Sequence, residues 1–180
     1  MKTKNLVLMS LFSAITVVCA QIVIPTSLVP FSLSLFAVFL TGAILDKRDA
    51  FLAQLVYVMI GIVGLPVFAN LRGGFEVIAG PTGGYIVAYP IMAYLVALSI
   101  EKFGNKSIMP YLAGMLAALI VCYSLGAIWL GTVTKMGFVA ALYKGVIPFI
   151  VFDLIKIILS ASVGVVLNEA LVKAGLYEKA

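Results

Sequence analysis

Histidine is absent from this chain of 180 residues, and cysteine occurs only at Cys19 and Cys122. Both cysteines lie inside apolar stretches, so metal and disulfide chemistry have almost no ligands. Charge is scarce as well, because 11% of the residues are charged, against about a quarter in an ordinary soluble domain. Hydrophobic residues make up 64% of the chain. This composition excludes a soluble fold and predicts one compact integral membrane domain.

Several functional motifs are missing too. The sequence has no Gly-x-x-x-x-Gly-Lys-Ser/Thr phosphate loop, no nucleophile with a neighbouring base and no potassium-channel filter. The chain alone therefore cannot be an energy-consuming pump, and no residue pattern points to a cofactor. The net charge of +5 indicates membrane topology and attraction to anionic lipid rather than binding of nucleic acid.

Six apolar segments follow when the chain is cut at its charges, glycines and prolines. They cover residues 5–24, 31–45, 50–67, 83–100, 108–131 and 146–172. The first could be misread as a secretory signal, but it continues to Pro25 and is long enough to span a bilayer. Backbone groups in a bilayer must be paired within their own segment, and alternating strand patterns are absent. We therefore predict an all-α bundle of six transmembrane helices forming one domain, 1–180.

The positions of Lys and Arg predict the orientation. One side of the predicted bundle carries eight: Lys2, Lys4, Lys47, Arg48, Lys102, Lys106, Lys173 and Lys179. The other side carries three: Arg72, Lys135 and Lys144. Since cytoplasmic loops are enriched in basic residues, both termini are expected in the cytoplasm. The second segment is short for a crossing, so its loop-facing end at 27–34 is expected to be partly buried in protein.

An acidic and a basic residue interrupt the last segment. Asp153 and Lys156 are three residues apart and share a helix face, and each would cost about 2.5 to 3.5 kcal/mol in hydrocarbon. They are either a structural ion pair or a pocket that offers an acceptor and a donor to a polar ligand. Counted from Lys144 along one helix, they lie about 13 and 18 Å deep. Gln54 reaches a comparable depth, as a pocket floor or as a partner for Lys156.

A long connection between the third and fourth segments, residues 64–85, is rich in glycine and only lightly charged. It is either a lid folded over the bundle or an ordinary turn and cap. As a lid it would bury Phe68, Phe75 and Ile78 and use Asn70 and Arg72 to bind something. Thr82 is expected to cap the next helix, whose free N–H groups could hold an anion or a carbonyl.

Small residues on the first segment allow another helix to approach closely. Ser10 and Ala14 have the required spacing. Packing within the bundle and contact with a partner protein would give the same pattern, so both interpretations stay open.

Three motifs together resemble the BioY family, the biotin-specific substrate-capture subunit of energy-coupling factor (ECF) transporters. They are Leu65-Pro66-Val67-Phe68-Ala69, Gly80-Pro81-Thr82-Gly83-Gly84-Tyr85, and Pro148-Phe149 followed by Asp153-Leu154-Ile155-Lys156. The resemblance implies biotin uptake into a prokaryotic cell, with a transmembrane coupling subunit and two cytoplasmic ATPases as partners. It also implies a multi-pass protein of the cell membrane, without enzymatic activity or cofactor. The family's first helix carries Ala-x-x-x-Ala, whereas Ser10 is the first small residue here.

The residues fit that ligand as follows. Asp153, with Asn70 nearby, would accept from the ureido N–H groups of biotin, while Lys156 would donate to the ureido carbonyl or balance the charge. The apolar body would lie against aromatic residues: Phe68, Tyr85 and Phe31. Arg72 or the helix start at Thr82 is left for the carboxylate. The alternatives are a substrate subunit for another vitamin, an intramembrane enzyme that uses the Asp153–Lys156 pair, and a membrane scaffold.

Overall fold

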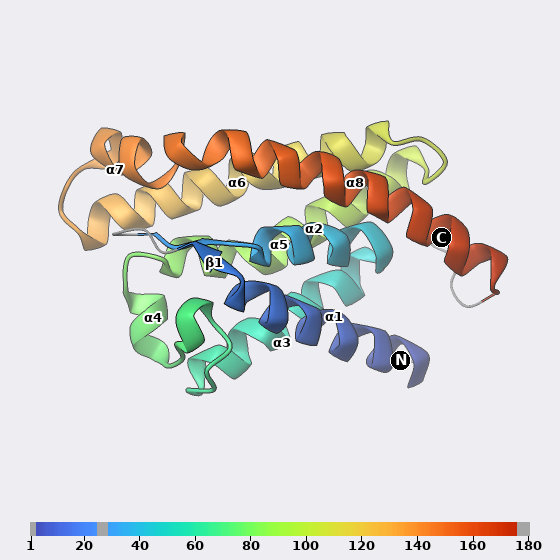
Figure 1. Ribbon diagram of the computed structural model, residues 1–180, viewed down its shortest axis with the longest axis horizontal. Helices are drawn as coiled ribbons and strands as arrows, with labels where there is room; N and C mark the ends of the chain where they lie inside the picture. The colour runs from blue at the N-terminus through green and yellow to red at the C-terminus, as the bar shows by residue number, and fades with distance from the viewer. Residues whose placement is uncertain (1–2, 25–28, 176–180) are drawn as a thin grey trace.

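The computed structural model describes residues 3–24 and 29–175 and is an elongated, mostly helical bundle (Figure 1). The α-helices are α1 Thr3–Gln21, α2 Ser34–Ile44, α3 Lys47–Ile62, α4 Phe75–Ala79, α5 Gly83–Phe103, α6 Met109–Val133, α7 Phe138–Gly145 and α8 Ile150–Lys173. Two short 3-10 helices are η1 Ala69–Leu71 and η2 Ile147–Phe149, and the strands β1 Val23–Ile24 and β2 Phe31–Ser32 form an antiparallel pair. The described residues are therefore mostly helical, as predicted, and the short strand pair was not predicted.

Helix α2 lies at the centre of the bundle. It packs against α1, α3, α5 and α8, and Figure 1 shows α6 and α8 on one side of it and α1 and α3 on the other. Every residue from Ala37 to Ile44 is buried. A helix that is apolar all round and only 11 residues long is stable when protein surrounds it, which explains the short second segment.

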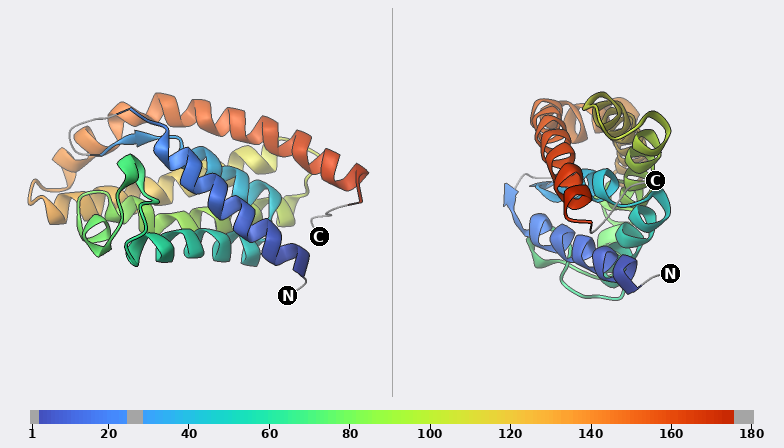
Figure 2. Two further views of the ribbon diagram at one scale, coloured as in Figure 1. Left: turned by 60° about the horizontal axis from the view of Figure 1, so that its bottom comes forward. Right: turned by 90° about the vertical axis from the view of Figure 1, so that its right-hand side faces the viewer.

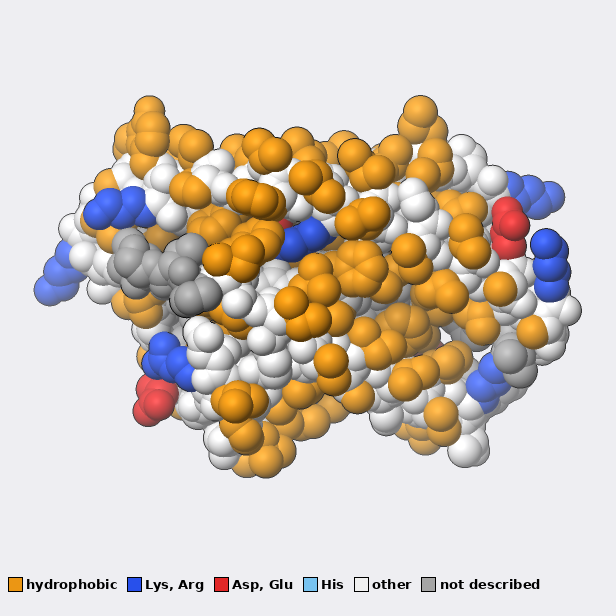
Figure 3. Space-filling model, in the orientation of Figure 1, with side chains coloured by type: hydrophobic (Ala, Val, Ile, Leu, Met, Phe, Trp, Pro, Cys, Tyr) orange, Lys and Arg blue, Asp and Glu red, His pale blue; other side chains and the backbone are white. Residues whose placement is uncertain are grey.

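Both ends of the described chain lie at the same end of the bundle, opposite α4, α7 and the strand pair (Figure 2). The starts of α1 and α3 and the ends of α5 and α8 carry Lys4, Lys47, Arg48, Lys102 and Lys173. Figure 3 shows a broad hydrophobic band across the visible face, with most Lys and Arg side chains at its two ends. The basic residues are therefore divided between two ends as predicted, although Lys2 and Lys179 lie outside the described residues.

Four described helical segments are long and apolar enough to cross a membrane: Thr3–Gln21, Gly83–Phe103, Met109–Val133 and Phe138–Lys173. The chain is thus a multi-pass membrane protein. Helix α2 is apolar but shorter, and α3 spans 16 residues and ends at Ile62 rather than at the predicted residue 67.

The last predicted segment, 146–172, corresponds to η2 and α8, which together cover Ile147 to Lys173. An additional short helix that was not predicted, α7, precedes it, and Val146 separates the two with a non-helical conformation at φ −130° and ψ −58°. Asp153 consequently lies in the first turn of α8. The depths of about 13 and 18 Å assumed one continuous helix from Lys144 and are therefore wrong.

Close packing of α5 on α6 depends on Gly84. A Cβ atom at this position would lie 2.4 Å from Cβ of Trp129 and 2.7 Å from the carbonyl oxygen of Leu125. We expect Gly84→Ala to destabilise the fold by about 1 kcal/mol, because backbone atoms must move to admit the methyl group. Ala117→Val, on the exposed face of α6, is the control that should leave the thermal unfolding midpoint in detergent unchanged. Equal midpoints for Gly84→Ala and the wild type would contradict this view of the interface.

Candidate ligand-binding site

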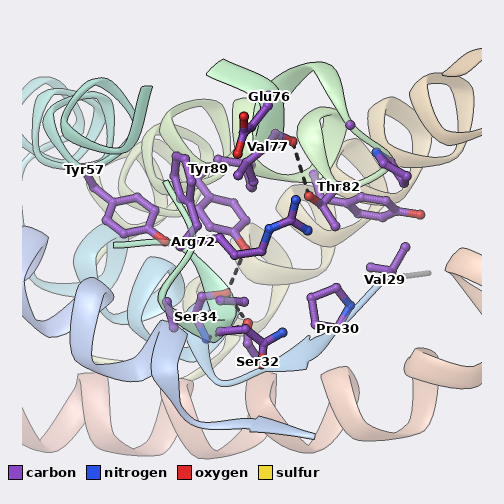
Figure 4. Close-up of a pocket in the computed structure, with 18 residues that line it drawn as sticks. Val29, Pro30, Ser32, Ser34, Tyr57, Arg72, Glu76, Val77, Thr82 and Tyr89 are labelled. Atoms are coloured by element: carbon purple, nitrogen blue, oxygen red, sulfur yellow. Dashed lines mark hydrogen bonds between the residues drawn. The ribbon is translucent and has the colours of Figure 1, made fainter. Parts of the chain in front are cut away.

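A cavity of about 290 Å³ lies at the end of the bundle opposite the termini (Figure 4). The segment between α3 and α5 covers one side of it, and β2 with the start of α2 forms the opposite side. Three predicted features of the 64–85 connection meet there, since Phe68, Asn70 and Arg72 all line the cavity. This segment therefore folds over the bundle as a lid rather than forming an ordinary turn. It buries Phe68 and Ile78 as predicted, whereas Phe75 is 68% exposed and the prediction that the lid buries it is wrong.

Aromatic rings build one wall of this cavity. The ring of Tyr57 contacts Phe68 edge-on at a centroid distance of 5.6 Å and stacks on Tyr89 at 6.2 Å. The lid can pack this closely because Gly61 of α3 has no side chain, and a Cβ atom there would meet the ring of Phe68. Such a wall suits a flat or apolar ligand body. Tyr57 and Tyr89 were not among the predicted site residues.

Polar groups line the rest of the cavity. Arg72 points into it, towards the side on which Thr82 lies (Figure 4), and the carboxylate of Glu76 also belongs to the lining. Asn70 has a left-handed backbone conformation, with φ 61° and ψ 36°. Thr82 stands at the N-cap position of α5, but its hydroxyl donates weakly to the carbonyl oxygen of Val77 at 3.5 Å instead of capping the helix.

Gln21 fastens the lid to α1. Its side-chain amide donates to the carbonyl oxygens of Val67 and Phe68, each at 3.2 Å, and its Oε1 accepts from the backbone N–H of Leu71 at 2.9 Å. These bonds satisfy backbone groups on both sides of the turn. The sequence contained a signal for this role, because Gln21 is a polar residue near the end of an apolar segment.

A smaller cavity of about 60 Å³ contains the charged pair. Lys156 donates to Oδ1 of Asp153 at 2.8 Å and to the backbone carbonyl oxygen of Ser32 at 2.7 Å. Asp153 is 2% exposed and Lys156 is 4% exposed, so the two charges neutralise each other away from solvent. The predicted pair thus exists, and it also holds strand β2 against α8.

Phe31 covers the pair. Nζ of Lys156 lies 3.8 Å from the ring centroid of Phe31, within cation–π range, and the same ring stacks on Phe149 at 6.0 Å. Phe31 also lines the small cavity, and its predicted contact with the ligand stays a prediction.

Tyr123 is a site residue that the sequence reasoning missed. Its hydroxyl donates to Oδ2 of Asp153 at 2.7 Å, so each carboxylate oxygen accepts one hydrogen bond. A tyrosine inside an apolar helix is usually a packing residue. The only signal in the sequence was the position of Tyr123 along its segment, which could have placed it at a depth similar to that of Asp153.

Tyr85 and its neighbours join the two cavities. Six residues line both of them: Val29, Pro30, Ser32, Ser34, Tyr85 and Tyr89. The hydroxyl of Tyr85 donates to the carbonyl oxygen of Gly145 at 2.9 Å, and Ser34 and Tyr89 share a hydrogen bond of 2.7 Å. The charged pair and the lid thus belong to one composite site, although Asn70 and Asp153 line different parts of it.

Gln54 lies outside the lining of both cavities. Its amide donates to the hydroxyls of Thr16 at 2.9 Å and Thr41 at 2.8 Å, which ties α3 to α1 and α2. These contacts differ from both predicted roles, a pocket floor and a partner of Lys156. Depth alone was misleading because it does not say which helices Gln54 faces, and in the structure it faces α1 and α2.

The small residues of α1 divide between two faces. Ser13 is buried and donates to the carbonyl oxygen of Ala53 at 2.7 Å, whereas Ser10 and Ala14 are exposed. Packing within this bundle therefore does not use Ser10 and Ala14, and their face is open to an external contact.

Comparison with known proteins identifies the family. A family model described as the BioY family matches residues 1–173. The chain belongs to the BioY family. It is 39% identical to the "Biotin transporter BioY" of Thermotoga maritima over 92% of this chain and 96% of that protein. It is 32% identical to the "Biotin transporter BioY2" of Lactococcus lactis over 98% of this chain and 96% of that protein.

A solved structure has the same fold as this BioY-family chain. It is described as the S-component for biotin from an ECF-type ABC transporter, and it superposes with a TM-score of 0.86. The match covers 94% of this chain and 95% of the other, at 23% sequence identity. At this identity the likeness shows the shared fold, and the residues of the site must be argued from this chain itself.

Proposed function

We propose that this chain captures biotin and serves as the substrate-binding subunit of an ECF-type transporter. One structural observation carries the proposal: the lid covers a cavity of about 290 Å³ that shares six lining residues with a smaller cavity containing the charged groups of Asp153 and Lys156. Biotin has an apolar body between a ureido ring and a carboxylate, so it needs polar groups at both ends of an apolar site. The BioY relatives named above support the choice of biotin.

The charged pair is proposed to bind the ureido ring. An ionised carboxylate has about four lone-pair sites, so Asp153 can accept a ureido N–H without giving up Tyr123 or Lys156. Lys156 has a third N–H available for the ureido carbonyl oxygen. Phe31 and Tyr85 would then contact the apolar body, as would Phe68 at the lid.

The remaining polar groups are proposed to bind the other end of the ligand. Arg72 lies in the larger cavity and can bind the carboxylate through two parallel hydrogen bonds. Asn70 and Thr82 lie in the same lining and add polar contacts there. The sequence analysis placed Asn70 near the ureido ring, and we now propose that it contacts the carboxylate end of biotin instead.

We further propose six crossings with both termini in the cytoplasm. The end that carries the termini holds most of the basic residues, as the positive-inside rule requires. Helix α3 is about 24 Å long and would cross with the help of its flanking turns, while α2 would cross inside the protein. The cavity then opens to the outside, where biotin is captured.

Energy must come from partner subunits, because the sequence has no phosphate loop. We propose a transmembrane coupling subunit and two cytoplasmic ATPases, with Ser10 and Ala14 on the exposed face of α1 as the docking surface. Such a subunit binds and carries its ligand without changing it, so neither an enzymatic reaction nor a cofactor is involved.

Calorimetric titration of the detergent-purified chain tests the proposal. Biotin is expected to bind with one-to-one stoichiometry, while thiamine and riboflavin give no heat. Binding of another vitamin instead of biotin would identify a substrate subunit of different specificity. A folded sample that binds none of the three would contradict the assignment.

A further inference from the structure

Helices α7 and α8 together are too long to form one membrane-crossing helix. The apolar segment Phe138–Lys173 has 36 residues, about 54 Å as one helix, against a hydrocarbon core of about 30 Å. The chain breaks at Val146 and restarts as α8, whose 24 residues already give about 36 Å. Helix α7 therefore lies at the boundary of the membrane, at the end of the bundle that holds the site (Figure 1).

The exposed face of α7 is apolar and partly aromatic. Phe138 is 50% exposed, and Val139 and Tyr143 are each 66% exposed, while Ala141 and Gly145 are buried against the bundle. Aromatic residues are enriched where hydrocarbon meets the headgroups, because their rings suit both environments. The exposed face of α7 therefore suits the boundary between hydrocarbon and headgroups.

Two lysines flank this face. Lys135 and Lys144 are exposed, and neither side chain forms an ion pair or hydrogen bond with any described residue. The sequence contains no Asp or Glu between Glu101 and Asp153, and Asp153 is buried with Lys156. The other charged residues at this end, Arg72 and Glu76, are part of the lid and line the larger cavity. The region around α7 is therefore purely basic.

We propose that α7, Lys135 and Lys144 form a binding site for anionic phospholipid. The two ammonium groups bind the phosphate region, while Phe138, Val139 and Tyr143 insert among the upper acyl carbons. Each lysine near an anionic membrane surface contributes about 1 kcal/mol, so the pair favours anionic over zwitterionic lipid about 30-fold.

This lipid site is connected to the ligand cavities. The carbonyl oxygen of Gly145, the last residue of α7, accepts the hydrogen bond from Tyr85, which lines both cavities. Lipid that anchors α7 thus holds Gly145 in position for Tyr85. The lipid site itself requires no vitamin, so it can be tested whether or not biotin is the ligand.

The experiment uses the full-length chain in nanodiscs that contain phosphatidylglycerol carrying a photoreactive acyl chain. After illumination, peptide mass spectrometry is expected to find cross-links within residues 133–147. Unlabelled phosphatidylglycerol should compete about 30 times better than phosphatidylcholine. The double substitution Lys135→Gln with Lys144→Gln should abolish this preference, whereas Lys135→Arg with Lys144→Arg should keep it.

A matched control removes two lysines from the opposite end. Lys102→Gln with Lys106→Gln changes the net charge equally and is expected to leave the labelling of α7 unchanged. Equal competition by the two lipids in the wild type, or a preference for phosphatidylglycerol that survives the loss of Lys135 and Lys144, would overturn the proposal.

Discussion

Replacing Asp153 by asparagine, or Lys156 by methionine, is expected to weaken biotin binding by about 2 to 5 kcal/mol. Either change leaves a buried charge without the opposite charge that neutralises it at 2.8 Å, and it weakens a proposed contact with the ureido ring. Calorimetric titration of each purified variant measures the loss. Tyr143→Phe, on the exposed face of α7, is the control that should bind biotin as the wild type does.

The double variant separates a ligand contact from a structural ion pair. Removing one partner of a buried pair costs about 3 to 5 kcal/mol of stability, whereas replacing both by uncharged groups is often neutral. We therefore expect Asp153→Asn with Lys156→Met to regain much of the unfolding midpoint that each single variant loses. Biotin binding should stay weak in the double variant, because the donor and the acceptor for the ureido ring are both gone.

Two results would contradict the proposed role of the pair. If the double variant recovered biotin affinity together with stability, Asp153 and Lys156 would only support the fold. Unchanged affinity in both single variants with normal folding would lead to the same conclusion. The bond from Lys156 to Ser32 gives the pair a structural contribution in any case, since it fixes strand β2.

The sequence predicts the helices well where one physical constraint dominates. Long apolar runs gave α1, α5 and α6 to within a few residues, because a crossing helix must pair its own backbone groups. The short second segment was correctly expected to be partly shielded by protein. The loop-facing residues 27 and 28 in that prediction lie outside the described residues.

Composition could not predict the short helix α7. The last predicted segment begins at residue 146, where the structure also interrupts the helix, but residues 138–145 were not assigned to any predicted helix. The strand pair is equally hidden, since two residues on each side carry no alternating pattern. Both features surround the site, which is why the depth of Asp153 was misjudged.

Charged residues of the site were easier to predict than neutral ones. Asp153, Lys156 and Arg72 stand out in an apolar chain because a charged side chain is costly in a membrane unless it is paired or has a function. Tyr57, Tyr89 and Tyr123 carry hydroxyls that are equally important to the site, but tyrosine is common in apolar helices. Their roles depend on which helix faces which, and a single sequence does not contain that information.

Replacing Arg72 by glutamine is expected to weaken biotin binding by about 1.5 to 3 kcal/mol, the value of a hydrogen bond to a charged group. Arg72 points into the larger cavity, and the proposed contact is with the carboxylate of biotin (Figure 4). Glu76 lines the same cavity and would repel that carboxylate, so the loss of Arg72 leaves an unfavourable charge behind.

Biotin amide makes this prediction specific. The amide has no negative charge, so it should bind the wild type more weakly than biotin does, and Arg72→Gln should change its affinity little. The matched control is Arg48→Gln, which removes the same charge at the opposite end of the bundle. If the wild type bound biotin amide as tightly as biotin, neither Arg72 nor the helix start at Thr82 would be a carboxylate site. The larger cavity would then select its ligand by the aromatic wall of Phe68, Tyr57 and Tyr89, and Arg72 would serve to balance Glu76.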